Sequence, residues 1–343
     1  HTLSAMFASS MSTHFVGEQL WFLIEGPPSC GKTTLMEGLA TAKKWYFSRD
    51  TIRGFHSGAK AENEKDLPLA DLVNGMTLGT KDGDTLLKAP NLPQILSEAR
   101  ALYDKVSRTN YRNFVNREYM GHRMTWHLAG TKAIHEIDDS ELGARFLCVV
   151  AMGKIDDAFE DSVAKIAARQ EARNMLLISD GKPESQHPAD LANAMALSGG
   201  YLDFLRNNAL ELAKSVVVSD RCLDRCAKFG KFIAFMRARP SRNDRKESIE
   251  REFSPRLVKQ LTRLMISEAC TLGKCETDDE VMARVHKIML DTSQGQTLEL
   301  MGILGPRLQG MEILGLSVLM NTSDEKLRKQ LKFLRQIGVV ETD

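Results

Sequence analysis

The chain has 343 residues, which is enough for two or three domains at roughly 100 to 200 residues each. Its 43% hydrophobic and 27% charged residues are typical of a globular protein, and no apolar run approaches the roughly 20 residues of a membrane helix. The net charge of +1 gives no overall sign of a nucleic-acid partner, and the start at His1 without a signal-peptide pattern predicts a fragment of a longer cytoplasmic protein with no membrane contact.

The strongest local signal is a phosphate-binding loop. Residues 26–33 match the pattern G-x-x-x-x-G-K-[ST], with the apolar strand 20–24 before them and a predicted helix over 34–42 after them. Lys32 is expected to reach the β- and γ-phosphates of ATP, and the Thr33 hydroxyl to ligate Mg²⁺. The expected nucleotide-binding residues are Gly26, Pro27, Pro28, Ser29, Cys30, Gly31, Lys32, Thr33 and Thr34.

Two further strands end in polar residues. Residues 76–84 resemble a weak strand that ends in Asp82 and Asp84, which are placed to hold Mg²⁺ and to polarise the attacking water. A tight Asp-Gly turn is the structural alternative. Residues 124–130 predict another strand, and Thr131 at its end is a candidate to contact the attacking water or the γ-phosphate, or to serve structure alone.

The pattern over residues 20–150 alternates short strands with helices, which predicts an α/β fold with a parallel sheet and the loop at its carboxyl edge. Residues 155–292 are almost entirely helical in pattern. Residues 312–320 predict a helix that is followed by a second helix with apolar positions on one face, and residues 338–340 predict a strand, in the order of a helix-turn-helix with the start of a wing. The expected divisions are 1–154, 155–294 and 295–343.

Basic residues gather in three places. Residues 220–246 hold nine basic and three acidic residues, which indicates either a phosphate-binding face or a solvated helix. Residues 105–123 interleave cations with aromatic rings, a pattern that suits single-stranded DNA, although a hairpin contacting the next subunit is the alternative. The loop 51–58 is a second DNA candidate, and the last helix has a basic surface that suits DNA or a protein. The candidate DNA contacts are Lys105, Arg108, Tyr111, Arg112, Arg117, Lys329 and Lys332.

The six cysteines contain no C-x-x-C pair, so we expect reduced, mostly buried thiols. Four of them have spacings that suit helices better than a zinc site, namely Cys222, Cys226, Cys270 and Cys275.

The order of the motifs resembles the AAA+ ATPases. Within them it resembles the helicase and initiator branch that includes the minichromosome-maintenance helicases, and it is also similar to AAA+ proteins of phages and mobile elements. The resemblance implies a P-loop AAA+ core, an all-helical lid and a C-terminal winged helix. It implies these roles: Asp82 as the Walker B acid, Thr131 as sensor 1, Arg145 as the arginine finger, and Arg256, or failing that Arg263, as sensor 2.

The chain departs from the family pattern at one position. Gly83 stands where the family has the catalytic Glu after the Walker B Asp. Asp84, two residues after Asp82, and Glu98 on the following helix are the candidate replacements.

The resemblance also implies a function. It predicts an ATP-hydrolysing motor that forms a homo-oligomer, expected to be a hexameric ring, and acts on single-stranded or forked DNA as a replicative helicase or origin-melting protein. The alternatives are an AAA+ remodelling or regulatory ATPase that acts on proteins in phage defence or transposition, and a slow nucleotide-gated assembly switch.

Overall fold

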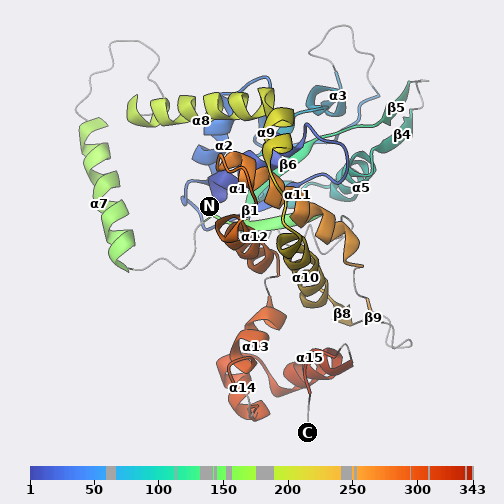
Figure 1. Cartoon of the computed structure of the whole chain (residues 1–343), viewed down its shortest axis with the longest axis vertical. Helices are drawn as coiled ribbons and strands as arrows, with labels where there is room; N and C mark the ends of the chain where they lie inside the picture. Colours follow the sequence, from blue (N-terminus) through green and yellow to red (C-terminus); the bar gives the residue numbers. More distant parts are fainter. Residues whose placement is uncertain are drawn as a thin grey trace.

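A five-stranded parallel sheet forms the centre of the molecule (Figure 1). Its strands lie in the order β2 (Tyr46–Arg49), β3 (Thr77–Thr80), β6 (Thr125–Gly130), β1 (Trp21–Glu25) and β7 (Phe146–Val150). The computed structural model describes residues 1–58, 67–111, 113, 115–131, 142, 145–151, 157–174, 189–240, 249–250, 253–293, 295–307, 310–336 and 338–341. The chain is therefore an α/β protein with a parallel sheet, as its sequence predicts.

Helices surround the sheet on both faces. Along the chain they are α1 (Thr2–Ser12), α2 (Lys32–Ala40), α3 (Leu69–Val73), α4 (Gly83–Leu87), α5 (Leu92–Tyr103), α7 (Asp157–Asn174), α8 (Ala189–Asn207), α9 (Ala209–Ser215), α10 (Asp220–Met236), α11 (Pro255–Thr271), α12 (Asp279–Thr292), α13 (Gln296–Leu304), α14 (Ile313–Leu319) and α15 (Asp324–Gln336). Two antiparallel pairs lie outside the sheet, β4 (Val106–Asn110) with β5 (Asn116–Met120) and β8 (Arg239–Pro240) with β9 (Ile249–Glu250).

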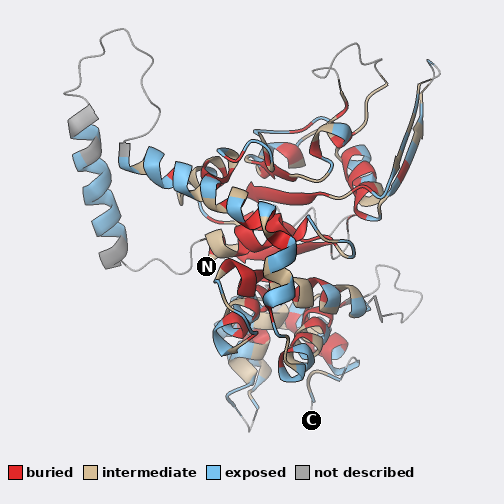
Figure 2. Cartoon of the chain, turned by 45° about the horizontal axis from the view of Figure 1, so that its top comes forward, coloured by how far each residue is buried: buried red, intermediate tan, exposed pale blue. Residues whose placement is uncertain are grey.

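The central strands β1 and β6 are buried along almost their whole length because helices cover both of their faces (Figure 2). On one face, Phe22 and Ile24 pack into a core formed with α1, α2 and the later helices. On the other face, Trp21 and Leu23 pack with the rings of Trp126 and other residues of a second core. The alternation along β1 therefore divides the interior into two cores.

The later helices share the first core with the N-terminal part of the chain. Leu257, Leu261 and Leu264 of α11 are buried in the same cluster as Met6 of α1 and Phe22 of β1. This helical region was predicted to be a lid that begins at residue 155. The predicted boundary at residue 154 does not separate two hydrophobic cores.

Side chains of α12 and of Arg237, the residue that follows α10, cover the outer edge of β7. The Thr292 hydroxyl accepts from the Cys148 amide at 2.9 Å, and the Asp291 carboxylate accepts from the Val150 amide at 3.1 Å. Arg237 donates to the Phe146 carbonyl at 3.0 Å. The backbone groups that an edge strand leaves unpaired are thereby satisfied by side chains.

The C-terminal segment forms a small helical bundle with a core of its own. Leu300 of α13, Leu316 of α14 and Leu331 of α15 are buried together, and the predicted pair of helices joined by a short turn is confirmed. The predicted strand over residues 338–340 is wrong. Val339 and Val340 instead pack against this cluster, and no described neighbouring segment pairs with them as a strand.

Candidate functional site

The predicted phosphate loop lies between β1 and α2, at the carboxyl edge of the sheet. Gly31 has φ +84° and immediately precedes α2, and Ser29 has φ +62°. The Lys32 ammonium group donates to the carbonyls of Gly26 at 2.7 Å and Pro27 at 2.8 Å. The loop therefore curls around the lysine, and its last residues lead into the N-terminus of a helix, which favours an anion.

Both glycines of the motif are needed for this geometry. A Cβ atom on Gly26 would lie 2.5 Å from the Cys30 sulfur, so a larger residue would push the loop open. At Gly31 there is open space, but its positive φ is strained for other residues.

A chain of hydrogen bonds joins the loop to the predicted acid and the predicted sensor. The Gly26 amide donates to the Gly130 carbonyl at 3.2 Å, at the point where β1 and β6 end side by side. The next residue, Thr131, donates from its amide and its hydroxyl, each at 3.0 Å, to the Asp84 carboxylate. Because β6 lies between β1 and β3, Asp84, Thr131 and the phosphate loop share one edge of the sheet.

Asp82 has a different position. Its carboxylate caps α4, where one oxygen accepts from the Thr85 amide at 2.9 Å and the other from the Thr85 hydroxyl. The side chain is exposed, two residues beyond the end of β3. Asp82 therefore caps a helix instead of standing in the tight Asp-Gly turn that was the structural alternative, and its role at Mg²⁺ remains a prediction.

Glu98 does not offer a base at this edge. Its side chain is buried, and it accepts from the amides of Phe55 at 2.7 Å and His56 at 3.2 Å and from the amide group of Gln94 at 2.8 Å. This carboxylate fixes the loop that follows β2. Of the two candidate replacements for the missing Glu, only Asp84 lies beside Thr131.

The predicted arginine finger, Arg145, and the predicted sensor 2 residue, Arg256, lie at the opposite edge of the sheet. Phe146 pairs with Trp21 at the start of β1, whereas the phosphate loop follows Glu25 at its end. Five strand residues separate these edges by about 13 to 16 Å. Arg145 directly precedes Phe146, and the Arg145 and Arg256 guanidinium groups lie 5.4 Å and 5.8 Å from the centre of the Tyr103 ring.

Within one chain, neither arginine is placed at the phosphate loop. The Arg145 side chain is only 9% exposed and pairs with the Asp104 carboxylate at 2.8 Å, so the single chain gives it a packing role. Arg263 lies at the same edge, where it donates to the carbonyls of Ser12 and Phe15. The arginine-finger and sensor 2 roles of these residues remain predictions, because each residue would have to act at the phosphate loop of another subunit.

The two segments expected to contact DNA are joined to each other. His56, in the loop 51–58, stacks on Tyr119 of β5 with ring centres 5.1 Å apart, and its ring nitrogens bond the hydroxyls of Ser107 and Thr109 at 3.1 Å each. Burial lowers the pKa of His56. The sequence pattern did not single out His56, because its partners lie 51 to 63 residues further along the chain.

Tyr111 and Tyr119, the rings of the hairpin that the structure describes, face the protein, and Phe114 lies outside the described residues. Tyr111 lies against Gly58, and Arg117 donates to the Ser57 carbonyl at 3.2 Å. Arg108 is on the outer face, 67% exposed, and pairs with Glu118 at 2.8 Å. Lys105 is half-buried with φ +66°, and Arg112 lies outside the described residues. The interleaved rings therefore anchor the hairpin more than they form a stacking surface.

The last helix carries a basic outer surface. Its apolar residues are buried, and the Lys329 ammonium group lies 3.0 Å from the Glu325 carboxylate. The exposed basic residues are Lys326, Arg328, Lys329, Lys332 and Arg335.

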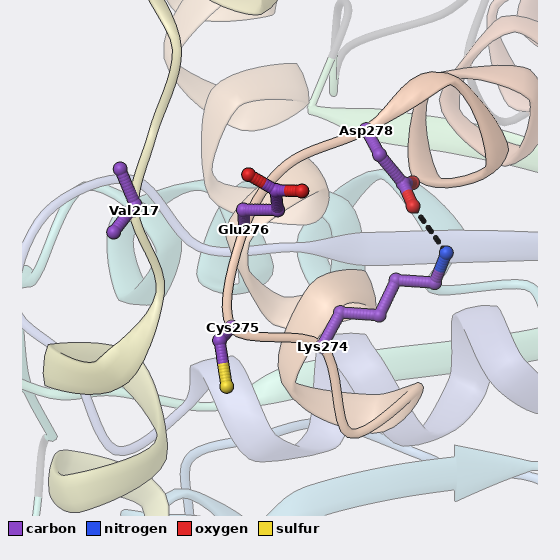
Figure 3. Close-up of a pocket in the computed structure, with 5 residues that line it drawn as sticks. All are labelled: Val217, Lys274, Cys275, Glu276 and Asp278. Atoms are coloured by element: carbon purple, nitrogen blue, oxygen red, sulfur yellow. Dashed lines mark hydrogen bonds and ion pairs between the residues drawn. The ribbon is translucent and has the colours of Figure 1, made fainter.

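A shallow pocket lies between the α9–α10 connection and the α11–α12 connection (Figure 3). The Val217 amide donates to the Cys275 carbonyl at 2.7 Å, which holds the two connections together. Lys274 bonds Asp278 and Glu280, and these bonds raise its pKa. A cation that is already paired with two carboxylates makes this pocket a poor phosphate site.

Neither a metal site nor a membrane span is found in the described part of the chain. No three His, Cys, Asp or Glu side chains there are grouped to hold a metal ion, and all six cysteines are free thiols. None of the helices described combines the length and apolar character that a membrane span requires. Comparison with known proteins found no matching protein-family model and no matching curated protein.

Proposed function

We propose that the chain is an ATP-hydrolysing P-loop ATPase of the AAA+ type that works as an oligomer on DNA. The observation that supports it best is the connected carboxyl edge, where Gly26 bonds Gly130 and Thr131 bonds Asp84. A phosphate loop, a polar sensor and an acid in contact are the groups that transfer of a phosphoryl group to water requires.

Each residue of this edge has a distinct proposed role. Lys32 exchanges its bonds to loop carbonyls for bonds to the β- and γ-phosphates, while the amides of residues 29–33 cradle the phosphate oxygens. Thr131 orients the attacking water, and Asp84 accepts its proton. The Thr33 hydroxyl and Asp82 would hold Mg²⁺, which supplies positive charge against the phosphates.

The AAA+ type is supported by the arrangement of strands. The strand that leads to Thr131 lies between the strand of the phosphate loop and the strand that leads to Asp82, so a sensor 1 residue would stand between Walker A and Walker B. In this proposal the helices from 155 to 294 act as the lid and the C-terminal bundle as the winged-helix counterpart.

The oligomer is supported by the position of the arginines. Positive charge lowers the barrier when it is already placed near the γ-phosphate. Since Arg145 and Arg256 lie at the far edge of the sheet, their proposed contribution is to the site of a neighbouring subunit in a hexameric ring. Arg145 would have to exchange its pairing with Asp104 on assembly.

The proposed DNA contact rests on exposed positive charge. The outer surface of α15 carries Lys329 and Lys332, and the hairpin carries Arg108, all exposed. Together with the family resemblance this favours a replicative helicase or origin-melting protein of a phage or mobile element.

A slow, nucleotide-gated switch is the second candidate. It is favoured because Gly83 replaces the family's Glu and because the Asp84 carboxylate already accepts two hydrogen bonds from Thr131. Thr131 therefore competes with the attacking water for hydrogen bonds to this carboxylate.

The experiment measures ATP binding and hydrolysis, with and without single-stranded and forked DNA, for the wild type, Lys32→Ala and Asp84→Asn. We expect Lys32→Ala to weaken nucleotide binding at least tenfold, and Asp84→Asn to bind ATP but to hydrolyse it about 100-fold more slowly. The exposed Lys88→Ala is the control and should behave as the wild type.

Three outcomes separate the candidates. Hydrolysis that DNA stimulates supports the motor, and slow hydrolysis that DNA does not change supports the switch. Hydrolysis that responds to a protein partner alone would indicate a remodelling ATPase. Failure of the wild type to bind ATP would overturn the proposal as a whole.

A further inference from the structure

The guanidinium group of Arg206, on α8, is buried without an ion pair to any described carboxylate. It is 4% exposed, donates to the carbonyls of Ser10 at 2.8 Å and Gly75 at 2.6 Å, and lies 4.5 Å from the centre of the Trp45 ring. Asp203, one turn earlier on the same helix, does not pair with it. Burial of a charge is costly when no opposite charge compensates it. The surroundings of Arg206 therefore favour an anion.

Four buried polar atoms around this arginine have no hydrogen-bond partner among the described residues. They are the hydroxyls of Ser10 and Thr77, the indole nitrogen of Trp45 and Nε of Arg206. The Thr77 amide donates to the Trp45 carbonyl at 2.8 Å, so Thr77 adjoins the residue whose ring lies against Arg206. All four atoms can donate, and the indole nitrogen and Nε can only donate. Together they are complementary to a ligand that supplies acceptors.

Further positive charge lies beside these donors. The Arg123 carbonyl accepts from the Gly75 amide at 2.6 Å, and the Arg123 guanidinium group donates to the His14 carbonyl at 2.9 Å. Burial and Arg123 lower the pKa of Arg206 to about 10. Burial, Arg206 and Arg123 also lower the pKa of His14. Like charges that gather in this way repel one another, and an anion between them would relieve the repulsion.

We propose that Arg206, Arg123 and the hydroxyls of Ser10 and Thr77 form a binding site for a small tetrahedral oxyanion of the phosphate class. Its oxygens carry enough lone pairs to accept from every one of these donors and charge to offset the arginines. The ion is free and not part of a DNA backbone, because Ser10 and Thr77 are both 0% exposed and a polymer would not reach them. Arg123 is half-buried and His14 is exposed, so the ion enters from their side.

The proposed anion site lies at the amino edge of the sheet, opposite to the phosphate loop. Trp45 directly precedes β2 and Thr77 begins β3, whereas the phosphate loop follows the end of β1. Because the strands are parallel, these positions lie at opposite edges. The site therefore stands apart from the proposed ATP chemistry, and a bound ion would tie α1 and α8 to the starts of β2 and β3.

Inorganic phosphate is the probe, and Trp45 and His14 report on the site. The Lys32→Ala chain serves as the reference, because its phosphate loop is weakened and does not dominate phosphate binding. We expect millimolar phosphate to change the Trp45 fluorescence. We also expect it to raise the pKa of His14, followed by NMR, toward its ordinary value of 6.5, because a nearby anion favours the imidazolium form. Trp45→Phe and His14→Gln identify the two signals.

Two substitutions in the reference chain, each with a matched control, test the contacts. We expect Arg123→Gln and Ser10→Ala each to weaken phosphate binding about tenfold, since each removes a donor to the ion. The first control is Arg49→Gln, exposed at the other end of β2. The second is Ser12→Ala, because the Ser12 hydroxyl already donates to the Ser9 carbonyl at 2.7 Å. Neither control should change the phosphate affinity.

Trp45 and His14 signals that phosphate leaves unchanged would overturn the site. A Ser10→Ala chain that binds phosphate as tightly as the reference would overturn it as well, and this variant is expected to fold because alanine is the best helix former. A single-stranded oligonucleotide at the same phosphate concentration separates the two sources of the anion. We expect it to leave both signals unchanged, and a response to the oligonucleotide that free phosphate does not reproduce would refute a small-ion site.

Discussion

Single side chains in this molecule are under strong constraints from their surroundings. His127 on β6 is fully buried between Ser9 and Tyr46, whose hydroxyls lie 2.7 Å and 3.3 Å from its ring nitrogens, and burial lowers its pKa to about 3. It is therefore neutral at every physiological pH and serves packing. The adjacent Gly79 on β3 is equally constrained, since a Cβ there would lie 2.5 Å from the Tyr46 ring.

Glu268 on α11 is expected to make stability depend on pH. Burial raises its pKa to about 7, although Ser4 hydrogen-bonds it and Arg284 lies near it. Because the folded pKa is above the unfolded value, this contribution to stability is fully present below the unfolded pKa, near 4.5, and is lost as the pH rises through 7. Glu268→Gln should therefore gain roughly 1 to 3 kcal/mol relative to the wild type between pH 5 and pH 8.

The measurement is the free energy of unfolding by urea at both pH values. The exposed Glu276→Gln is the matched control for the loss of a carboxyl group at the surface. An unchanged difference for Glu268→Gln would show that the buried carboxyl does not titrate in this window.

At the scale of the elements, the covered edge of β7 is a testable feature. In Thr292→Val the shape of the side chain is kept, but the buried Cys148 amide loses its acceptor. We expect a loss of about 1 to 3 kcal/mol in the free energy of unfolding. Thr51→Val, at an exposed position, is the matched control and should stay within about 0.5 kcal/mol of the wild type. Equal stability of the two variants would contradict the role given to Thr292.

The elements also show what the sequence could and could not predict. The strand before the phosphate loop, the helix after it and the strand before Thr131 were predictable because their apolar runs and their motifs are local. The pairing of the buried Arg145 with Asp104, across 41 positions, was not. Neither was the docking of the hairpin rings on the loop 51–58, since spacing alone does not tell which side of a hairpin meets the protein.

The predicted strand at Val339 and Val340 failed for a similar reason. Two β-branched residues favour a strand locally, but a strand forms only beside a partner, and in the described residues these two pack on helices instead.

At the scale of the whole molecule, the C-terminal bundle is separable from the larger cores. Its buried leucines belong to one small cluster, to which Ala238, just after α10, is the only described residue before α13 that contributes. Removal of residues 295–343 should therefore lower the free energy of unfolding of the remaining chain by less than about 1 kcal/mol, while removing the basic surface of α15. The measurements are urea unfolding and DNA binding, and unfolding of the shortened chain would refute the separation.

The shared core has a consequence for how the protein is made. Helix α1 and strand β1 occupy the first 25 residues, yet they pack against α11 and α12, which end at Thr292. A ribosome adding roughly 5 to 20 residues per second would need many seconds to deliver those partners. During that time the apolar faces of the nascent N-terminal segment stay open to chaperones, and the first core cannot close before α12 has emerged.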